Sequence, residues 1–210
     1  MLHRRILLCP GPSLPCLALL VCVGLWTGRA DLASELFRQD SVVAFVGGAD
    51  VVSMLDSGHL EARITAACPD RNLKFRNFGW EGDTVYEQPR DYGFPSLLQH
   101  LRKAEVDVLF LQFGRAEALD GAERIHKFTT AYEDLLGELG VLKAALVLVI
   151  PPPYEDGEGA MPKLSQRNPD LELYAKAIRK LAREKNLPCI DLFTRGPEPE
   201  ERLTSNGLQL

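Results

Sequence analysis

The sequence predicts a three-layer α/β/α sandwich, in which helices cover both faces of a five-stranded parallel sheet. Strand-like apolar runs alternate with helix-like segments along the chain, and this alternation is typical of parallel sheets with right-handed crossovers. Several of the runs are apolar throughout, as expected for strands that are buried on both faces. The 210 residues are 46% hydrophobic and 25% charged, which suits one globular domain with a real core.

Five short segments with apolar runs are expected to form the strands. In chain order they are Val42–Val46, Leu73–Asn77, Val106–Phe113, Ala144–Ile150 and Leu187–Phe193. The first strand ends on Gly47-Gly48, a pair that lets the backbone turn sharply. In open α/β sheets, ligands and catalytic side chains collect at the carboxyl ends of the strands. The turn after the first strand is therefore the first place to look for a site.

Four segments between the strands are expected to be helical, with their apolar residues gathered in stripes. They are Asp50–Ala67, Phe94–Ala104, Ala122–Leu139 and Asn168–Lys185. Pro95 favours a helix start and Gly140 a helix end. Two long loops follow strands: Phe78–Tyr92, rich in glycine and aromatic residues, and the acidic Pro151–Lys163. The acidic loop is expected to be solvated, with contact to a ligand as the alternative.

The first thirty residues are predicted to be a cleaved signal peptide. A basic start at Arg4-Arg5 precedes a largely apolar stretch, and Ala30 offers a small residue for cleavage. An uncleaved membrane anchor is the alternative, although Leu14–Trp26 is short for a span. The protein is therefore expected to be exported, secreted or periplasmic, with the domain covering residues 31–210.

Charge and cysteine usage narrow the function classes. The chain has a net charge of −5, and residues 31–210 carry 21 basic against 29 acidic side chains. A charge of −8 argues against nucleic acid or an anionic membrane as the main partner.

Three of the five cysteines lie in the first thirty residues, leaving Cys68 and Cys189, whose spacing neither requires nor excludes a disulfide. No metal site is indicated by the spacing of cysteine and histidine, and no cofactor is expected.

Four blocks that follow predicted strands carry glycines and polar residues. The most specific is Asn77-Phe78-Gly79-Trp80-Glu81-Gly82-Asp83-Thr84, a tight loop whose backbone N–H groups could bind an oxyanion, or whose Asp83 or Thr84 could cap a helix. The other three are Phe45-Val46-Gly47-Gly48-Ala49, Phe113-Gly114-Arg115-Ala116-Glu117 and Ser205-Asn206-Gly207-Leu208-Gln209-Leu210. With these blocks in order, residues 42–210 resemble the SGNH hydrolase family, also called GDSL-like esterases and lipases. The resemblance implies the flavodoxin-like strand order 2-1-3-4-5.

The resemblance also implies an ester-hydrolysing site, but the residues that would carry it are replaced. The family uses a serine nucleophile, an Asp–His pair, and an oxyanion hole that includes an asparagine. At these family positions the chain has Ala49, Asn206, Gln209 and Ala116. The oxyanion-hole glycine, Gly82, is the remnant. The leading hypothesis is therefore a catalytically inactive pseudo-esterase that keeps a binding role at the old crevice.

Two alternatives remain open. The first is an active ester hydrolase, of the esterase, lipase or carbohydrate deacetylase type, that uses displaced residues such as Ser53 and His126. Without a catalytic role, His126 would be a solvated helix residue, and the same holds for His59 and His100. The second alternative is a decayed or truncated product without a selected function.

Candidate ligand-binding residues are Arg115, Asn77 and Asp83, for a small molecule or a glycan- or ester-like ligand. Arg115 is the best single candidate for binding an anion, although it could instead pair with Glu117. Family members continue past the fourth block into a final helix on the sheet, and this helix is apparently missing here. Its loss would expose an apolar patch, covered by a protein partner or by the polar lead-in Asp31–Asp40.

Overall fold

The computed structural model describes residues 35–157 and 161–194. The strands are β1 (Val42–Gly47), β2 (Lys74–Asn77), β3 (Val108–Gln112), β4 (Ala145–Ile150) and β5 (Cys189–Asp191). The α-helices are α3 (Ala49–Ser53), α4 (His59–Ala67), α5 (Leu97–Lys103), α6 (Ile125–Leu139) and α7 (Asn168–Glu184). Each predicted strand is present, with its bounds shifted by a few residues.

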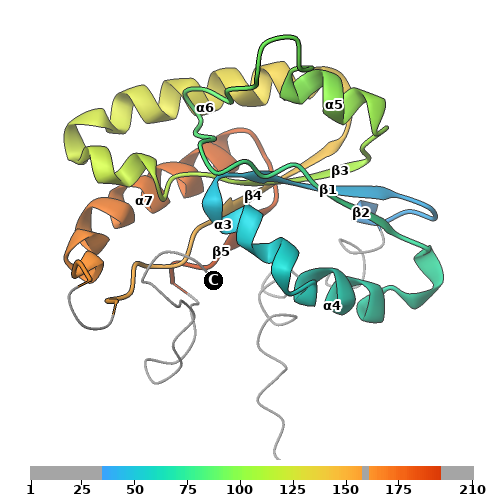
Figure 1. The fold of residues 1–210 in the computed structure, drawn as a ribbon, viewed down its shortest axis with the longest axis horizontal. Coiled ribbons are helices and arrows are strands. Elements are labelled where there is room, and N and C mark those ends of the chain that lie inside the picture. The colour runs from blue at the N-terminus through green and yellow to red at the C-terminus, as the bar shows by residue number, and fades with distance from the viewer. Residues whose placement is uncertain (1–34, 158–160, 195–210) are drawn as a thin grey trace, which may run out of the picture.

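All strand pairs are parallel and the spatial order is β2-β1-β3-β4-β5, which confirms the predicted α/β sandwich and its strand order (Figure 1). The chain starts in the middle of the sheet, moves to one edge and then returns past β1 to the other edge. This reversal places β1 and β3 side by side, with Gly47 paired to Gln112 at their carboxyl ends. The loops that follow these two strands therefore share one edge of the sheet.

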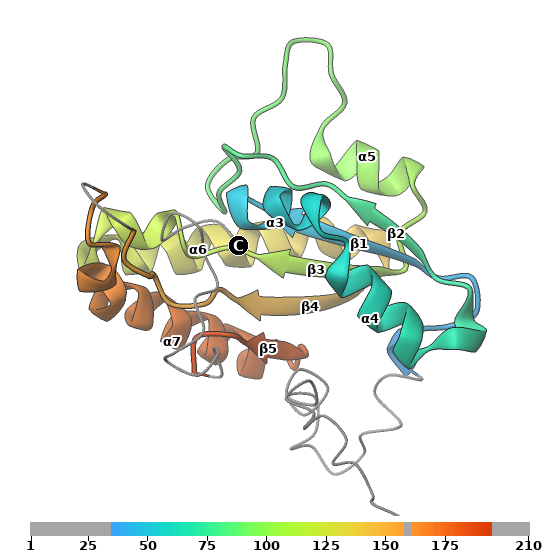
Figure 2. The ribbon, with the colours of Figure 1, turned by 60° about the horizontal axis from the view of Figure 1, so that its bottom comes forward.

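Helices α5, α6 and α7 cover one face of the sheet, and α3 and α4 cover the other (Figure 2). Alternate residues of each central strand serve the two faces, since successive side chains in a strand point in opposite directions. In β1, Ala44 and Val46 join the core under α5–α7, while Val43 and Phe45 join the core under α3 and α4. The apolar runs that predicted buried strands are thus explained by two separate cores.

The prediction of one helix over Asp50–Ala67 is wrong. The segment forms α3, a 3₁₀ turn at Met54–Asp56 and then α4. Gly58 adopts the left-handed conformation, with φ of 60°, and this breaks the helix. Helix α4 has no fully buried residue, so little packing holds it to the sheet. The weak, irregular apolar stripe in the sequence is consistent with this thin cover.

The lead-in before β1 is not wholly polar. Phe37 is 8% exposed and stacks on Phe110 of β3, with ring centroids 6.4 Å apart. It lies in the same core as α3 and α4. The described part of the lead-in therefore covers some of that sheet face, while its suggested role in place of a C-terminal helix stays a prediction. No helix in the described part of the chain is long and apolar enough to cross a membrane.

Gly47 closes β1 where no side chain fits. A Cβ atom built there would lie 2.3 Å from the carbonyl oxygen of Gln112 and 2.7 Å from Cγ2 of Val51. We expect Gly47→Ala to lower the free energy of unfolding by about 3 kcal/mol, because both neighbours are part of the packed interior. Urea denaturation measures the change. Gly137→Ala in α6 is the control, since its added methyl group meets no atom within 4 Å, and it should stabilise by up to about 1 kcal/mol.

Candidate functional site

The turn after β1 presents Ala49, the family's nucleophile position. Gly48 caps α3, and Ala49 is the first residue of that helix and is half-buried. One hydrogen bond and one close approach join the turn to the next loop. The backbone N–H of Trp80 donates to the carbonyl of Gly47 over 3.1 Å. Gly48 lies so close to Asp83 that a Cβ atom built on it would be 2.9 Å from the carbonyl oxygen of Asp83. The first and second blocks therefore touch, and the group presented at their junction is a methyl group.

The second block is shaped by its own polar side chains. Asn77 donates from Nδ2 to the carbonyl of Val51 over 2.7 Å and accepts the N–H of Gly79 over 2.8 Å. Asp83 is buried and receives both guanidinium nitrogens of Arg90, at 2.7 and 2.9 Å. Burial raises the pKa of Asp83 and the hydrogen bonds from Arg90 oppose this. Both side chains have partners within the protein, so their role in ligand binding stays a prediction.

Arg115 does not pair with Glu117, which corrects the sequence-based suggestion. Its Nη1 lies 3.2 and 3.3 Å from the two carboxylate oxygens of Asp50, and both residues are buried. Gln112 donates from Nε2 to the same carboxylate over 3.3 Å. Burial raises the pKa of Asp50, and the charge of Arg115 opposes the change. Arg115, the best candidate for binding an anion, is thus already paired with the carboxylate of Asp50, and its role in binding a ligand stays a prediction.

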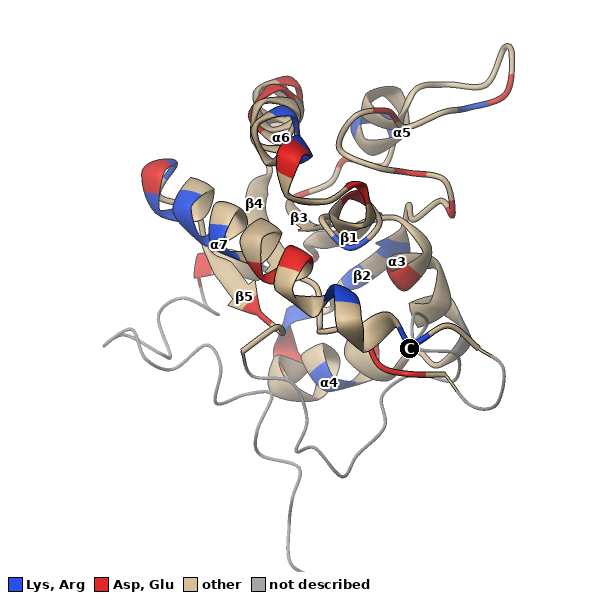
Figure 3. Cartoon of the chain, turned by 90° about the vertical axis from the view of Figure 1, so that its left-hand side faces the viewer, with Lys and Arg blue, Asp and Glu red and all other residues tan. Residues whose placement is uncertain are grey.

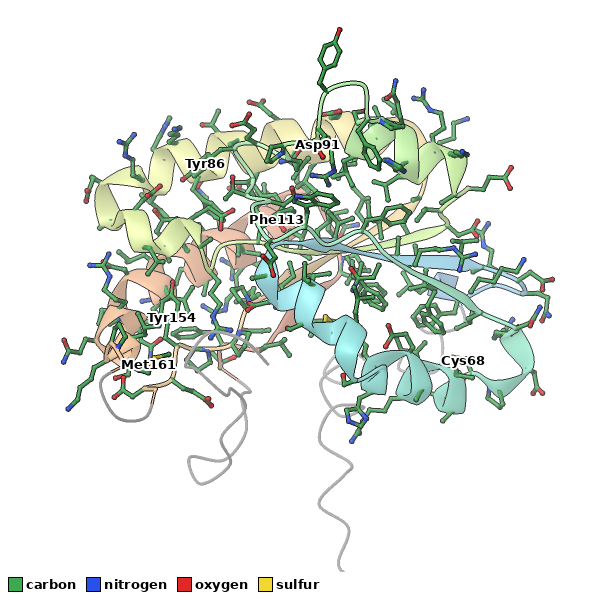
Figure 4. All side chains as sticks on the ribbon, viewed as in Figure 1. Cys68, Tyr86, Asp91, Phe113, Tyr154 and Met161 are labelled. Carbon is green, nitrogen blue, oxygen red and sulfur yellow. The ribbon has the colours of Figure 1, made fainter. Side chains whose placement is uncertain are left out.

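Tyr154 completes this buried cluster. Its ring centroid lies 5.4 Å from the guanidinium carbon of Arg115, and its hydroxyl donates to the carbonyl of Arg115 (Figure 4). Burial raises the pKa of this hydroxyl. The expectation of a solvated loop after β4 is wrong at Tyr154, which is 2% exposed. We name Asp50, Gln112, Arg115 and Tyr154 the mouth cluster, because it joins the segments after β1, β3 and β4.

Glu117 ties the third block to the second. Its carboxylate accepts the N–H of Gly114 and the N–H of Val85, each over 2.8 Å, and the side chain is buried. Burial raises the pKa of Glu117, while these N–H donors oppose the shift. The carboxylate therefore serves as an internal acceptor between two loops.

The pKa of Glu117 predicts a dependence of stability on pH. A carboxyl whose pKa is higher in the folded than in the unfolded protein contributes less to the free energy of unfolding as the pH rises above its unfolded pKa. Glu117→Gln cannot titrate there. The free energy of unfolding of the native protein minus that of the variant should therefore fall as the pH rises above 4.5, the ordinary pKa of this side chain, and urea denaturation measures the change.

The control for this measurement is Glu172→Gln on α7. Glu172 is exposed, and the hydrogen bond from Lys176 lowers its pKa, so any change with pH should be small and of the opposite sign. A difference for Glu117 that grows with pH would show that the backbone donors outweigh burial.

The structure brings three of the four blocks together. Gly47 bonds to Trp80, Asp50 to Arg115, and Val85 to Glu117, so the loops after β1, β2 and β3 meet. Gly82 and Ala116, the remaining family positions in these loops, are exposed. Asn206 and Gln209 lie outside the described residues, as do the proposed signal peptide and the C-terminal segment.

The displaced pair considered as an alternative is not brought together. Ser53 belongs to α3, and its hydroxyl donates to the carbonyl of Asp50 over 2.8 Å. His126 is exposed on α6, which covers the opposite face of the sheet. Among residues 35–157 and 161–194, no group of three histidine, cysteine or carboxylate side chains could hold a metal ion, and Cys68 and Cys189 are both free thiols.

Comparison with known families decides the relationship. The model of the GDSL-like lipase/acylhydrolase family matches residues 40–208. The chain belongs to this family. Among curated proteins, the comparison finds no match.

Several solved structures of this family share the fold. A protein described as a GDSL-like lipase from Parabacteroides merdae has 17% identity and a TM-score of 0.62, covering 82% of this chain and 89% of its own. A GDSL-like lipase from Bacteroides thetaiotaomicron has 12% identity and a TM-score of 0.57, with 80% and 79% covered. The acetylxylan esterase Axe2 from Geobacillus stearothermophilus has 14% identity and a TM-score of 0.54, with 76% and 79% covered. At these identities, the likeness concerns the fold.

Proposed function

We propose that this GDSL-family protein does not hydrolyse esters by the family's serine mechanism and instead binds a ligand at the crevice where hydrolysis would occur. The observation that carries the proposal is Ala49. It stands at the nucleophile position, on a turn whose backbone contacts to the second block are intact. A methyl group has no lone pair with which to attack a carbonyl carbon.

The neighbouring positions support the same conclusion. Ala116 offers no amide to an oxyanion, and Gln209 is not a base near neutral pH. A glycan or ester-like compound is the proposed ligand class, since acetylxylan esterases are among the structural neighbours.

The test is an ester-hydrolysis assay on the full chain, with p-nitrophenyl acetate as substrate and a serine-reactive fluorophosphonate as probe. We expect no labelling, and no turnover above that of an equal amount of heat-denatured protein. Turnover that is abolished by Ser53→Ala or His126→Ala would overturn the proposal and favour a displaced active site.

We also propose that the protein is exported and that residues 1–30 are removed. The basic start, the apolar stretch and Ala30 support this proposal. Expression in a bacterial host with fractionation, followed by N-terminal sequencing, should give a mature chain that begins at Asp31. A chain that retains Met1 in the membrane fraction would favour the anchor.

A further inference from the structure

The exposed aromatic side chains of the described chain gather on one loop. Trp80, Tyr92 and Phe94 are 46%, 108% and 52% exposed, and no other aromatic residue within 35–157 and 161–194 is exposed to this degree. All three belong to the loop between β2 and α5, and the part of this loop next to α5 stands out from the body of the protein (Figure 2). Concentrated exposure of large aromatic groups indicates an interaction site.

Trp80 is held more firmly than an incidental surface residue. Its backbone N–H donates to the carbonyl of Gly47, and its backbone carbonyl accepts the N–H of Asp83 over 2.9 Å. The guanidinium carbon of Arg90 lies over the indole, 5.0 Å from the ring centroid. Arg90 is itself fixed by two hydrogen bonds to the buried carboxylate of Asp83. One face of the indole is therefore supported, while nearly half of the side chain stays open beside the turn that carries Ala49.

The loop that carries this ring is mostly acidic, and among the described residues the one basic contact to its other aromatic rings is Lys127 of α6 over Tyr86. Glu81, Glu87 and Asp91 are exposed on the same loop, where Figure 3 shows mostly acidic positions, and Asp91 lies on its outer part (Figure 4). The one basic residue between Phe78 and Phe94 is Arg90, whose side chain is 8% exposed and paired with Asp83. An acidic rim repels phosphates and carboxylates, but its carboxylates accept hydrogen bonds from neutral hydroxyl groups.

We propose that Trp80 is a stacking platform for a neutral sugar ring of a glycan, at the edge of the crevice beside Ala49. The C–H groups on one face of a pyranose pack on the electron-rich face of an aromatic ring, and its hydroxyls meet polar groups at the rim. The indole supplies the face, and the carboxylate of Glu81, the next residue, accepts from the sugar hydroxyls. The proposal rests on the binding role proposed above and names the ligand class for it.

The chain provides its own reporter for the experiment. Its two tryptophans are Trp26 and Trp80, so in the full chain carrying Trp26→Phe the indole emission comes from Trp80 alone. We would titrate this protein with xylohexaose, cellohexaose, mannohexaose and chitohexaose, and with hexagalacturonate as the anionic comparison. At least one neutral hexasaccharide should change the emission saturably, and hexagalacturonate should not.

Isothermal titration calorimetry then compares variants with that hexasaccharide. Trp80→Ala should raise Kd at least about tenfold, which corresponds to about 1.4 kcal/mol. The control is Leu55→Ala, whose side chain is 60% exposed and aliphatic, and its Kd should stay within about twofold of the parent value. Circular dichroism verifies that each variant is folded.

The outcomes separate this proposal from the preceding one. If no neutral hexasaccharide binds at up to about 10 mM, or if folded Trp80→Ala binds as tightly as the parent, the platform is overturned. Release of acetate from acetylated xylohexaose is measured in parallel. Binding without release supports both proposals, whereas binding with release keeps the platform and overturns the loss of hydrolysis. If neither binding nor release occurs, the proposal that Trp80 is a stacking platform is overturned, whereas the proposed loss of hydrolysis is not.

Discussion

Removing either charge of the Asp50–Arg115 pair is expected to cost about 3 kcal/mol of the free energy of unfolding, because it takes a direct ion-pair contact away from a buried charge. Asp50 is 8% and Arg115 is 6% exposed. The two test variants are Asp50→Asn and Arg115→Met. Their combination should cost less than the sum of the single changes by about 2 kcal/mol, since both changes remove the same contact between two buried side chains. Urea denaturation of the four proteins at pH 7 gives this coupling energy directly.

The exposed pair Glu172–Lys176 on α7 is the matched control. Its Nζ–Oε1 distance is 2.8 Å, shorter than the distances in the mouth cluster, but the two side chains are 46% and 58% exposed. Glu172→Gln and Lys176→Met should therefore be close to additive, because exposed ion pairs contribute little to stability. Additive costs for Asp50→Asn and Arg115→Met would show that water already screens the buried pair.

The mouth cluster has a consequence for the crevice. Asp50 directly follows the nucleophile position and Arg115 directly precedes the family's asparagine position. Their ion pair, together with the hydrogen bond from Tyr154 to the carbonyl of Arg115, links the segments after three neighbouring strands. These loops are held by buried groups whose contacts do not involve the family's catalytic positions. Such rigidity suits binding, because a ligand then meets a preformed surface.

The strands and their order could be predicted because their signals are local. Runs such as Ala144–Ile150 are apolar throughout, and the four blocks tie the chain to a family whose strand order is known. The helix boundaries were less accessible. The single left-handed residue Gly58 divides an expected helix, and the cap formed by Ser96 and Gln99 moves the start of α5 to Leu97. The first effect depends on the backbone of one residue and the second on the side chains of a pair, and neither is reported by the spacing of apolar residues.

The candidate site was predictable in place but not in its bonds. Ala49, Gly82 and Ala116 lie in loops that meet, as the strand order requires. The partner of Arg115 was not found, although Asp50 stands at the end of the neighbouring strand and offered a signal. Tyr154 carried no such signal, since it sits among prolines and acidic residues that are typical of solvated loops. Its ring belongs to the core under α5–α7 and lies beside the guanidinium of Arg115, contacts that arise only when the strands come together.

Restoring four residues should return ester hydrolysis to the protein. The variant combines Ala49→Ser, Ala116→Asn, Asn206→Asp and Gln209→His, which supplies the nucleophile, the oxyanion donor and the Asp–His pair of the family pattern. We expect p-nitrophenyl acetate to be hydrolysed about 10²-fold faster than by the parent, well below the contribution of a native triad, because the surrounding side chains are not adapted to it. The fluorophosphonate probe should label this variant.

The control carries the same changes except Ala49→Ser and should stay at the parent's rate, because it has no nucleophile. Gly48 is left unchanged in both proteins, although the family has aspartate there, since a Cβ at this position would lie 2.9 Å from the carbonyl oxygen of Asp83. A folded four-residue variant that is no faster than the control would mean that the mouth cluster has altered the crevice beyond the lost side chains. In that case adding Arg115→Met and Asp50→Asn together would be the next step, because the pair borders both restored positions in the first and third blocks. Hydrolysis by the first variant, in contrast, would show that the loss of catalysis lies in the side chains alone and that the turn after β1 still presents position 49 as the family's nucleophile requires.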